Sequence, residues 1–167
     1  KEEHKKIFEG NIHVEREKLK HRDTGFDMEQ HFSDAKRTAP IDPSVKGVLE
    51  TLAKKYTLGI LSSAREHGLR GYLEHIHIER LFSFVYGFET GKLKIAKFQK
   101  VLQEFGVSTD QCLFVTDTLG DILEANKVGI KTIALDSGYH ERERLERGKP
   151  ANIISSLSEL IDVAEKL

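Results

Sequence analysis

Two acids, Asp117 and Asp121, form the part of this sequence best suited to chemistry. They lie four positions apart, directly after the apolar segment 112–116 and at the start of a helical pattern. Carboxylates in this arrangement suit Mg²⁺, which typically uses one or two protein carboxylates and keeps several waters. There is also a structural interpretation, in which Asp117 or Thr118 caps the helix and Asp121 complements its N-terminal dipole. The spacing alone leaves both interpretations open.

Two hydroxyls, Ser62 and Ser63, follow another apolar segment, 57–61. A hydroxyl at a strand end, beside free backbone N–H groups at a helix start, can hold a phosphate group. An ordinary helix cap is the alternative, and for an isolated serine it is the more common one. Ser62 and Ser63 are therefore candidates for phosphate binding.

Lys92 follows Gly91 in a turn that precedes a further helical pattern. A lysine can serve phosphate as a point charge, so Lys92 is a third candidate for the same site. A solvated basic face is the competing interpretation, because three more lysines stand close by: Lys94, Lys97 and Lys100.

These residues belong to a regular alternation of elements that begins at Asp42. Five short apolar segments predict buried strands at 57–61, 82–86, 112–116, 131–135 and 152–155, with helical patterns between them. Such an alternation is typical of an α/β protein with a Rossmann-like parallel sheet covered by helices on both faces. The carboxyl ends of parallel strands share one edge, which is where ligands bind in these sheets. The serines and the acids all follow strands at that edge.

Residues 1–38 differ from the rest of the chain. They are rich in charged residues and histidine and contain no β-branched run, which predicts surface helices. The prolines at positions 40 and 43 mark a boundary, because a proline disfavours helix in the residue before it. We therefore expect a small helical unit at 1–38 and an α/β unit at 39–167.

Composition limits the classes of function. The chain has 167 residues, 38% hydrophobic and 32% charged, with a net charge of −1. This balance is globular and offers no electrostatic case for nucleic acid or an anionic membrane as partner. No apolar stretch reaches a spanning length, and the one cysteine cannot form an internal disulfide. A cytoplasmic protein is the expectation.

The order of the motifs resembles the haloacid dehalogenase-like (HAD) superfamily, in its phosphoglycolate-phosphatase-like and β-phosphoglucomutase-like branch. A strand ends in serine, Gly-Lys precedes a helix, and a later strand ends in Asp-x-x-x-Asp. The resemblance runs over residues 40–167. It implies that Ser62 binds phosphate, that Lys92 is the catalytic lysine that offsets phosphoryl charge, and that Asp117 and Asp121 form the Mg²⁺ site.

The chain departs from the family's pattern at two positions near these motifs. Thr116 replaces the usual glycine before the first acid, and Leu93 replaces the proline that commonly follows the lysine. Either change is expected to alter the local backbone, so Lys94 and Lys97 are the alternatives to Lys92.

A larger departure concerns the nucleophile. The family's first motif is an apolar strand ending in Asp-x-Asp, whose first aspartate attacks phosphorus and whose second acts as general acid and base. This sequence contains no Asp-x-Asp. In the family that strand lies between the Ser62 strand and the Asp117 strand. We therefore expect an open position in the sheet, closed by the flanking strands or filled by another segment or chain, with 1–38 as the latter part of a cap.

The resemblance implies a Mg²⁺-dependent phosphatase of a small phosphorylated metabolite, inactive in this form for want of the aspartate. A non-catalytic scaffold that binds a phospholigand or a protein is the first alternative. A phosphomutase, which would share every residue named here, is the second. A receiver or flavodoxin-like domain fits less well, since a receiver has an acidic cluster after its first strand and a lysine late in the chain.

Overall fold

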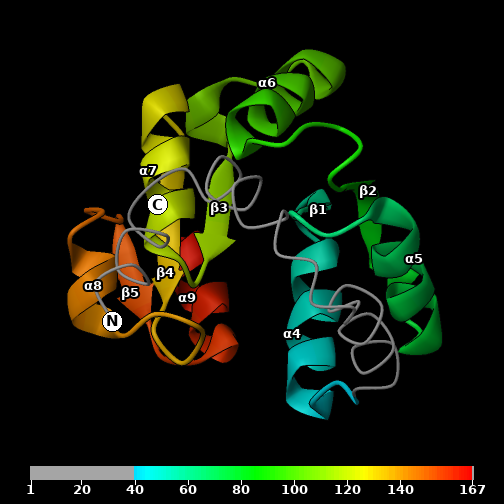
Figure 1. Ribbon diagram of the computed structural model, residues 1–167. Coiled ribbons are helices and arrows are strands. Elements are labelled where there is room, and N and C mark those ends of the chain that lie inside the picture. The colour runs from blue at the N-terminus through cyan, green and yellow to red at the C-terminus, as the bar shows by residue number, and fades with distance from the viewer. Residues whose placement is uncertain (1–39, 167) are drawn as a thin grey trace, which may run out of the picture.

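The computed structural model describes residues 40–166, so the predicted helical unit at 1–38 lies outside the described part of the chain. The strands are β1 (Leu58–Leu61), β2 (Phe82–Tyr86), β3 (Leu113–Thr116), β4 (Lys131–Leu135) and β5 (Asn152–Ile154). The helices are α4 (Pro43–Ala53), α5 (Glu66–His75), α6 (Lys94–Phe105), α7 (Leu119–Val128), α8 (Arg142–Glu146) and α9 (Leu160–Ala164). Strands and helices alternate as the sequence predicted (Figure 1). No helix in this stretch is long and apolar enough to cross a membrane.

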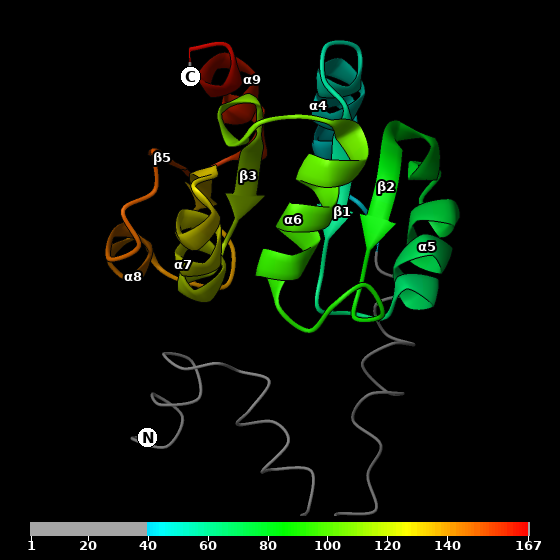
Figure 2. The same ribbon diagram turned by 90° about the horizontal axis from the view of Figure 1, so that it is seen from above.

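The strands form two parallel sheets. β1 pairs with β2, while β3, β4 and β5 form the second sheet with β4 at its centre. The neighbouring strands of the two sheets are β1 and β3 (Figure 2), and within residues 40–166 no ladder joins them. The sequence predicted a sheet interrupted between these two strands, and the flanking strands have not closed up across the interruption.

Helices cover both faces, as expected. On one face, Val48 and Leu52 of α4 pack in a cluster with Ile154 of β5 and with residues of α9. On the other face, Phe98 of α6 and Ala125 of α7 form the centre of a second cluster. α5 packs beside β2 at the outer side of the smaller sheet (Figure 2).

The two sheets are joined by side chains instead of backbone hydrogen bonds. Leu58 of β1 and Val115 of β3 pack against the cluster under α4 and α9. Leu61 and Phe114, from the same two strands, pack against the cluster under α6 and α7. Alternate strand residues point to opposite faces, so each helical layer holds both strands in place. This arrangement sets the ends of β1 and β3 near one another.

Local sequence signals place the helix ends where the structure has them. Asp42 caps α4 by accepting from the backbone N–H of Ser44 at 2.8 Å. Gly106 and Gly129 end α6 and α7 with φ of 62° and 85°, a conformation that glycine adopts without steric cost. A capping box formed by Ser156 and Glu159 stands before α9.

Candidate active site

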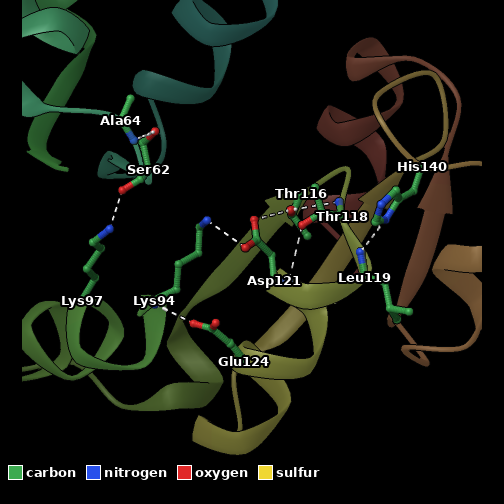
Figure 3. A network of polar contacts seen from close by, with 10 residues as sticks. All are labelled: Ser62, Ala64, Lys94, Lys97, Thr116, Thr118, Leu119, Asp121, Glu124 and His140. Carbon is green, nitrogen blue, oxygen red and sulfur yellow. Dashed lines mark hydrogen bonds and ion pairs between the residues drawn. The ribbon is translucent and has the colours of Figure 1, made fainter. Parts of the chain in front are cut away.

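The candidate site lies at the carboxyl ends of β1 and β3. The arrows of β2 and β3 point the same way in Figure 2, and each strand is parallel to its partners. The strand ends of both sheets therefore share one edge. At that edge α6 extends two lysines, one toward the end of β1 and one toward α7 (Figure 3). Helix α6 thus connects the two halves of the site.

Lys94 is the first of these lysines. Its Nζ lies 2.8 Å from Asp121 Oδ1, and the two side chains are only 9% and 23% exposed. The hydroxyl of Thr116 donates to the other oxygen, Asp121 Oδ2, at 2.9 Å and accepts from the Thr118 N–H at 3.3 Å. The threonine that replaces the expected glycine therefore helps to hold Asp121 in place.

Lys97 is the second. It is fully buried, and its Nζ donates to the backbone oxygen of Ser62 at the end of β1. Burial lowers the pKa of Lys97, and the positive charge of Lys94 lowers it further. A solvated basic face was one interpretation of these lysines, and it is wrong for Lys94 and Lys97. It holds for Lys100, whose side chain is 48% exposed.

Asp117 is held by a loop that comes after β4. Its Oδ2 accepts from the Tyr139 N–H at 2.8 Å, and its backbone oxygen accepts from the His140 N–H at 3.1 Å. Gly138 lies so close that a Cβ added there would stand 2.3 Å from the Asp117 Cβ. A glycine is therefore needed for the loop to reach the aspartate.

His140 is a site residue that the sequence did not reveal. It is 7% exposed, and its Nδ1 accepts from the Leu119 N–H, at the start of α7, at 2.9 Å. Burial lowers the pKa of His140, and the charge of Arg144 adds to this effect. Because Nδ1 accepts the bond from Leu119, it carries no hydrogen, and the ring hydrogen is on Nε2.

The loops after β1 and β2 are tied together by Glu66. This carboxylate accepts from the Gly87 N–H at 3.0 Å and from the Thr90 hydroxyl. In the opposite direction, the Glu66 N–H donates to Glu89 Oε2 at 2.9 Å. These bonds fix the backbone just beyond Ser62.

The predicted phosphate-binding residues differ in their surroundings. Ser62 is half-buried, and its Oγ accepts from the Ala64 N–H at 3.1 Å. Ser63 and Lys92 are exposed, with Lys92 in the loop before α6. The ammonium groups held against the ends of β1 and β3 belong to Lys94 and Lys97, which the sequence had as alternatives to Lys92.

The predicted Mg²⁺ ligands, Asp117 and Asp121, stand at the end of β3 and in the first turn of α7. Asp121 is engaged through both oxygens, by Lys94 and by Thr116. Asp117 accepts through Oδ2 from Tyr139. Among residues 40–166 no group of three His, Cys, Asp or Glu side chains could hold a metal. Asp117 and Asp121 are two carboxylates, and Mg²⁺ typically uses one or two protein carboxylates and keeps several waters.

The arrangement combines groups that handle phosphate. The Ser62 hydroxyl after β1 can bind a phosphoryl oxygen, and buried ammonium groups can offset its charge. Fixed charges of this kind, in place before a reaction begins, are the main means of stabilising a phosphoryl transition state.

Residues 3–135 match the protein family described as "Haloacid dehalogenase-like hydrolase". A phosphoglycolate phosphatase from Pasteurella multocida is 28% identical over 127 residues, which are 74% of this chain and 57% of that protein. Another from Photorhabdus laumondii is 30% identical over 123 residues, which are 71% of this chain and 53% of that protein. The chain spans about half the length of the curated relatives it matches.

Solved structures share the fold. A haloacid dehalogenase-like family hydrolase from Streptococcus pneumoniae superposes with a TM-score of 0.72 at 23% identity, covering 77% of this chain and 62% of that one. The L-2-haloacid dehalogenase of Xanthobacter autotrophicus gives 0.66 at 18% identity, covering 80% and 64%.

Proposed function

The chain belongs to the family of haloacid dehalogenase-like hydrolases, and on that premise we propose that it serves the Mg²⁺-dependent hydrolysis of a small phosphomonoester. One observation carries the proposal: α6 buries two lysines at this edge of the sheets. Lys94 pairs with Asp121, beside the end of β3, and Lys97 donates to the Ser62 carbonyl at the end of β1. The relatives named phosphoglycolate phosphatase favour a small anionic substrate of that kind.

In this proposal the phosphoryl group binds at the end of β1. The Ser62 hydroxyl donates to one of its oxygens. Lys94 offsets its charge, the role that the sequence assigned to Lys92. The burial of Lys94 and its ion pair with Asp121 support this choice, because an ammonium group shielded from water acts more strongly on a nearby charge.

Asp117 is the proposed Mg²⁺ ligand, with Asp121 supporting the site through Lys94. The loop at Tyr139 engages only one of the Asp117 oxygens, which leaves Oδ1 for a cation. When bound, Mg²⁺ would supply Lewis-acid stabilisation of the phosphoryl oxygens.

The nucleophile is proposed to come from a strand that pairs between β1 and β3. Within residues 40–166, β1 has a ladder only with β2 and β3 only with β4, so each keeps one edge available. A carboxylate oxygen at the end of such a strand would attack phosphorus while the bond from phosphorus to the substrate oxygen breaks. A second acid would protonate the departing oxygen, then take a proton from the water that hydrolyses the acyl phosphate.

Peptide complementation tests this function. The purified chain would be mixed with a synthetic apolar strand that ends in Asp-x-Asp, and phosphate release from phosphoglycolate would be measured with Mg²⁺ and with EDTA. We expect release only with chain, peptide and Mg²⁺ together, and none with asparagine in place of the first peptide aspartate. Release by the chain alone, abolished by Asp117→Ala, would show that the nucleophile lies within these residues.

A binding role without catalysis is the second candidate. It is favoured by the lack of any Asp-x-Asp among the 167 residues. In that case inorganic phosphate would bind at the end of β1, and no complementing strand would produce turnover. The peptide experiment therefore separates the two.

A further inference from the structure

The segment 117–119 is held twice by one residue, His140. The His140 N–H donates to the Asp117 backbone oxygen at 3.1 Å. Its imidazole Nδ1 accepts from the Leu119 N–H at 2.9 Å, and this bond is buried. A carbonyl and an N–H two residues apart are thus fixed by a single residue 21 positions beyond Leu119 in the chain.

These bonds surround the aspartate at the end of β3. Since the Tyr139 N–H donates to Asp117 Oδ2 at 2.8 Å, the loop 138–140 engages both the backbone and the carboxylate of Asp117. The Cα of Gly138 also lies against the Asp117 side chain, at a position where a Cβ would not fit. Movement of His140 would therefore move the backbone from which the carboxylate projects.

The bond to Leu119 has a second effect. Leu119 is the first residue of α7, where the N–H groups have no partner inside the helix. The Thr118 side chain accepts from the Asp121 N–H, and His140 accepts from the Leu119 N–H. The imidazole thus fixes the point at which the chain turns from β3 into α7, between the two acids of the site.

We propose that His140 is a positioning residue that orients Asp117 to bind a divalent cation. The inference rests on the proposed function, because it takes Asp117 as the cation ligand. His140 itself touches neither cation nor substrate. It acts as residues behind metal ligands commonly do, where substitution weakens metal binding by about 10- to 100-fold.

Two substitutions of His140 separate positioning from packing. His140→Asn keeps an acceptor, because the asparagine Oδ1 is attached to Cγ, as the histidine Nδ1 is. His140→Phe keeps a ring of similar size and has no acceptor. Leu73→Ala is the matched control, since it removes a buried side chain, 4% exposed, from α5 on the far side of the smaller sheet.

The 167-residue chain would be titrated with MgCl₂ by calorimetry, and NMR would monitor exchange of the Leu119 amide hydrogen and the carboxylate carbon resonance of Asp117. We expect His140→Phe to weaken Mg²⁺ binding by about tenfold, to speed exchange at Leu119 and to shift the Asp117 resonance. His140→Asn should restore all three. Leu73→Ala should lower Tm and leave Mg²⁺ affinity unchanged.

The outcomes distinguish this inference from the proposed function. Unchanged Mg²⁺ affinity in His140→Phe, with faster exchange at Leu119, would overturn positioning and leave His140 as a helix cap. Equal loss of affinity in Leu73→Ala would also overturn it. A wild-type chain that binds no Mg²⁺ would count against the proposed metal site. It would remove the premise of this inference as well, whereas an unshifted Asp117 resonance in His140→Phe would overturn the positioning role alone.

Discussion

Lys94 Nζ and Asp121 Oδ1 lie 2.8 Å apart and join the first turns of α6 and α7. The backbone reinforces this junction, because the N–H of Lys94 donates to Glu124 Oε2 at 2.6 Å. A carboxylate from α7 therefore caps the N-terminus of α6, where negative charge is stabilising. The lysine that we assign to the phosphoryl group is fixed through both its main chain and its side chain.

The ion pair predicts a large difference between two lysines of the same segment. Lys94→Met should lower the free energy of unfolding by about 2 kcal/mol. This is less than the roughly 3–5 kcal/mol for breaking a fully buried pair, because Asp121 is 23% exposed and keeps its bond to Thr116. Lys92→Met, at an exposed position, should change it by less than about 0.5 kcal/mol. Urea denaturation measures both.

The same two variants test which lysine binds phosphate. Titration with inorganic phosphate should give weaker binding in Lys94→Met and wild-type binding in Lys92→Met. The reverse order would return the role to Lys92, as the sequence first indicated.

Glu66 predicts a dependence of stability on pH. The hydrogen bond from the Thr90 hydroxyl, and to a smaller extent that from the Gly87 N–H, hold the pKa of this carboxyl below its usual value of 4.5. The ionised form is favoured by folding, so its contribution is present above pH 4.5 and is lost as the pH falls through the lowered pKa. Glu66→Gln should cost about 1 kcal/mol at pH 7. The difference from wild type should shrink as denaturation is repeated at successively lower pH. A difference that is constant down to pH 3, about 1.5 units below the unfolded value, would contradict this role of the charge.

Gly138 predicts a local effect on the metal site. In Gly138→Ala the new Cβ would lie 2.6 Å from Asp117 Oδ2, so the carboxylate must shift. Mg²⁺ binding should weaken by about tenfold, as for other changes behind a metal ligand.

The control for this substitution is Gly71→Ala, in the middle of α5. Beyond its chain neighbours and the backbone of its own helix, no atom lies within 4 Å of a Cβ added there, and alanine favours helix over glycine by up to about 1 kcal/mol. It should raise stability and leave Mg²⁺ binding unchanged. Calorimetric titration with Mg²⁺ would be carried out on both variants. Equal loss of Mg²⁺ affinity in both would show a general effect of replacing glycine and would contradict a local role of Gly138.

Cys112 predicts slow alkylation. Burial raises the pKa of this thiol, and the charge of Asp110 raises it further. Since the thiolate is the reactive form, iodoacetamide should modify the folded chain more slowly at pH 8 than the chain in urea, with a rate that climbs as the pH is raised. The sequence has one cysteine, so the mass of the intact protein reports the reaction directly. Equal rates in the two states would refute the shift.

Much of the fold could be predicted because each strand is a short apolar run bounded by polar residues. The predicted segments 82–86 and 131–135 coincide with β2 and β4, and the others differ by one residue at an end. Asp117 and Asp121 could be placed for the same reason, since the end of a strand determines the position of the next few residues. These signals are local, and local signals survive in a single sequence.

The identity of the buried lysine depends on where α6 begins, and that could not be predicted. The helix starts at Lys94, so Lys94 and Lys97 share a face with Phe98, while Lys92 falls in the loop. The sequence did carry one signal for their burial: Lys94 and Lys97 occupy positions that belong to the apolar face of the helix. His140 gave none, because it stands alone in an irregular loop, and its partner Leu119 is 21 residues away.

The contact between the β1 and β3 halves has a mechanical consequence. Hydrogen-bonded strands are locked at a spacing of about 4.8 Å, whereas hydrophobic contacts have no preferred direction. Within residues 40–166 no ladder joins the two strands, and their side chains meet in the two hydrophobic clusters under the helices. Separating the two halves would therefore leave the ladder bonds of each sheet intact, and its cost would fall on the hydrophobic clusters that hold both strands. Polar bonds would be stretched as well. The bonds from Lys97 to the Ser62 oxygen and from the Tyr86 hydroxyl to Glu104 both join α6 to the β1 half, and the bond from Lys55 to Glu165 joins the segments that follow α4 and α9.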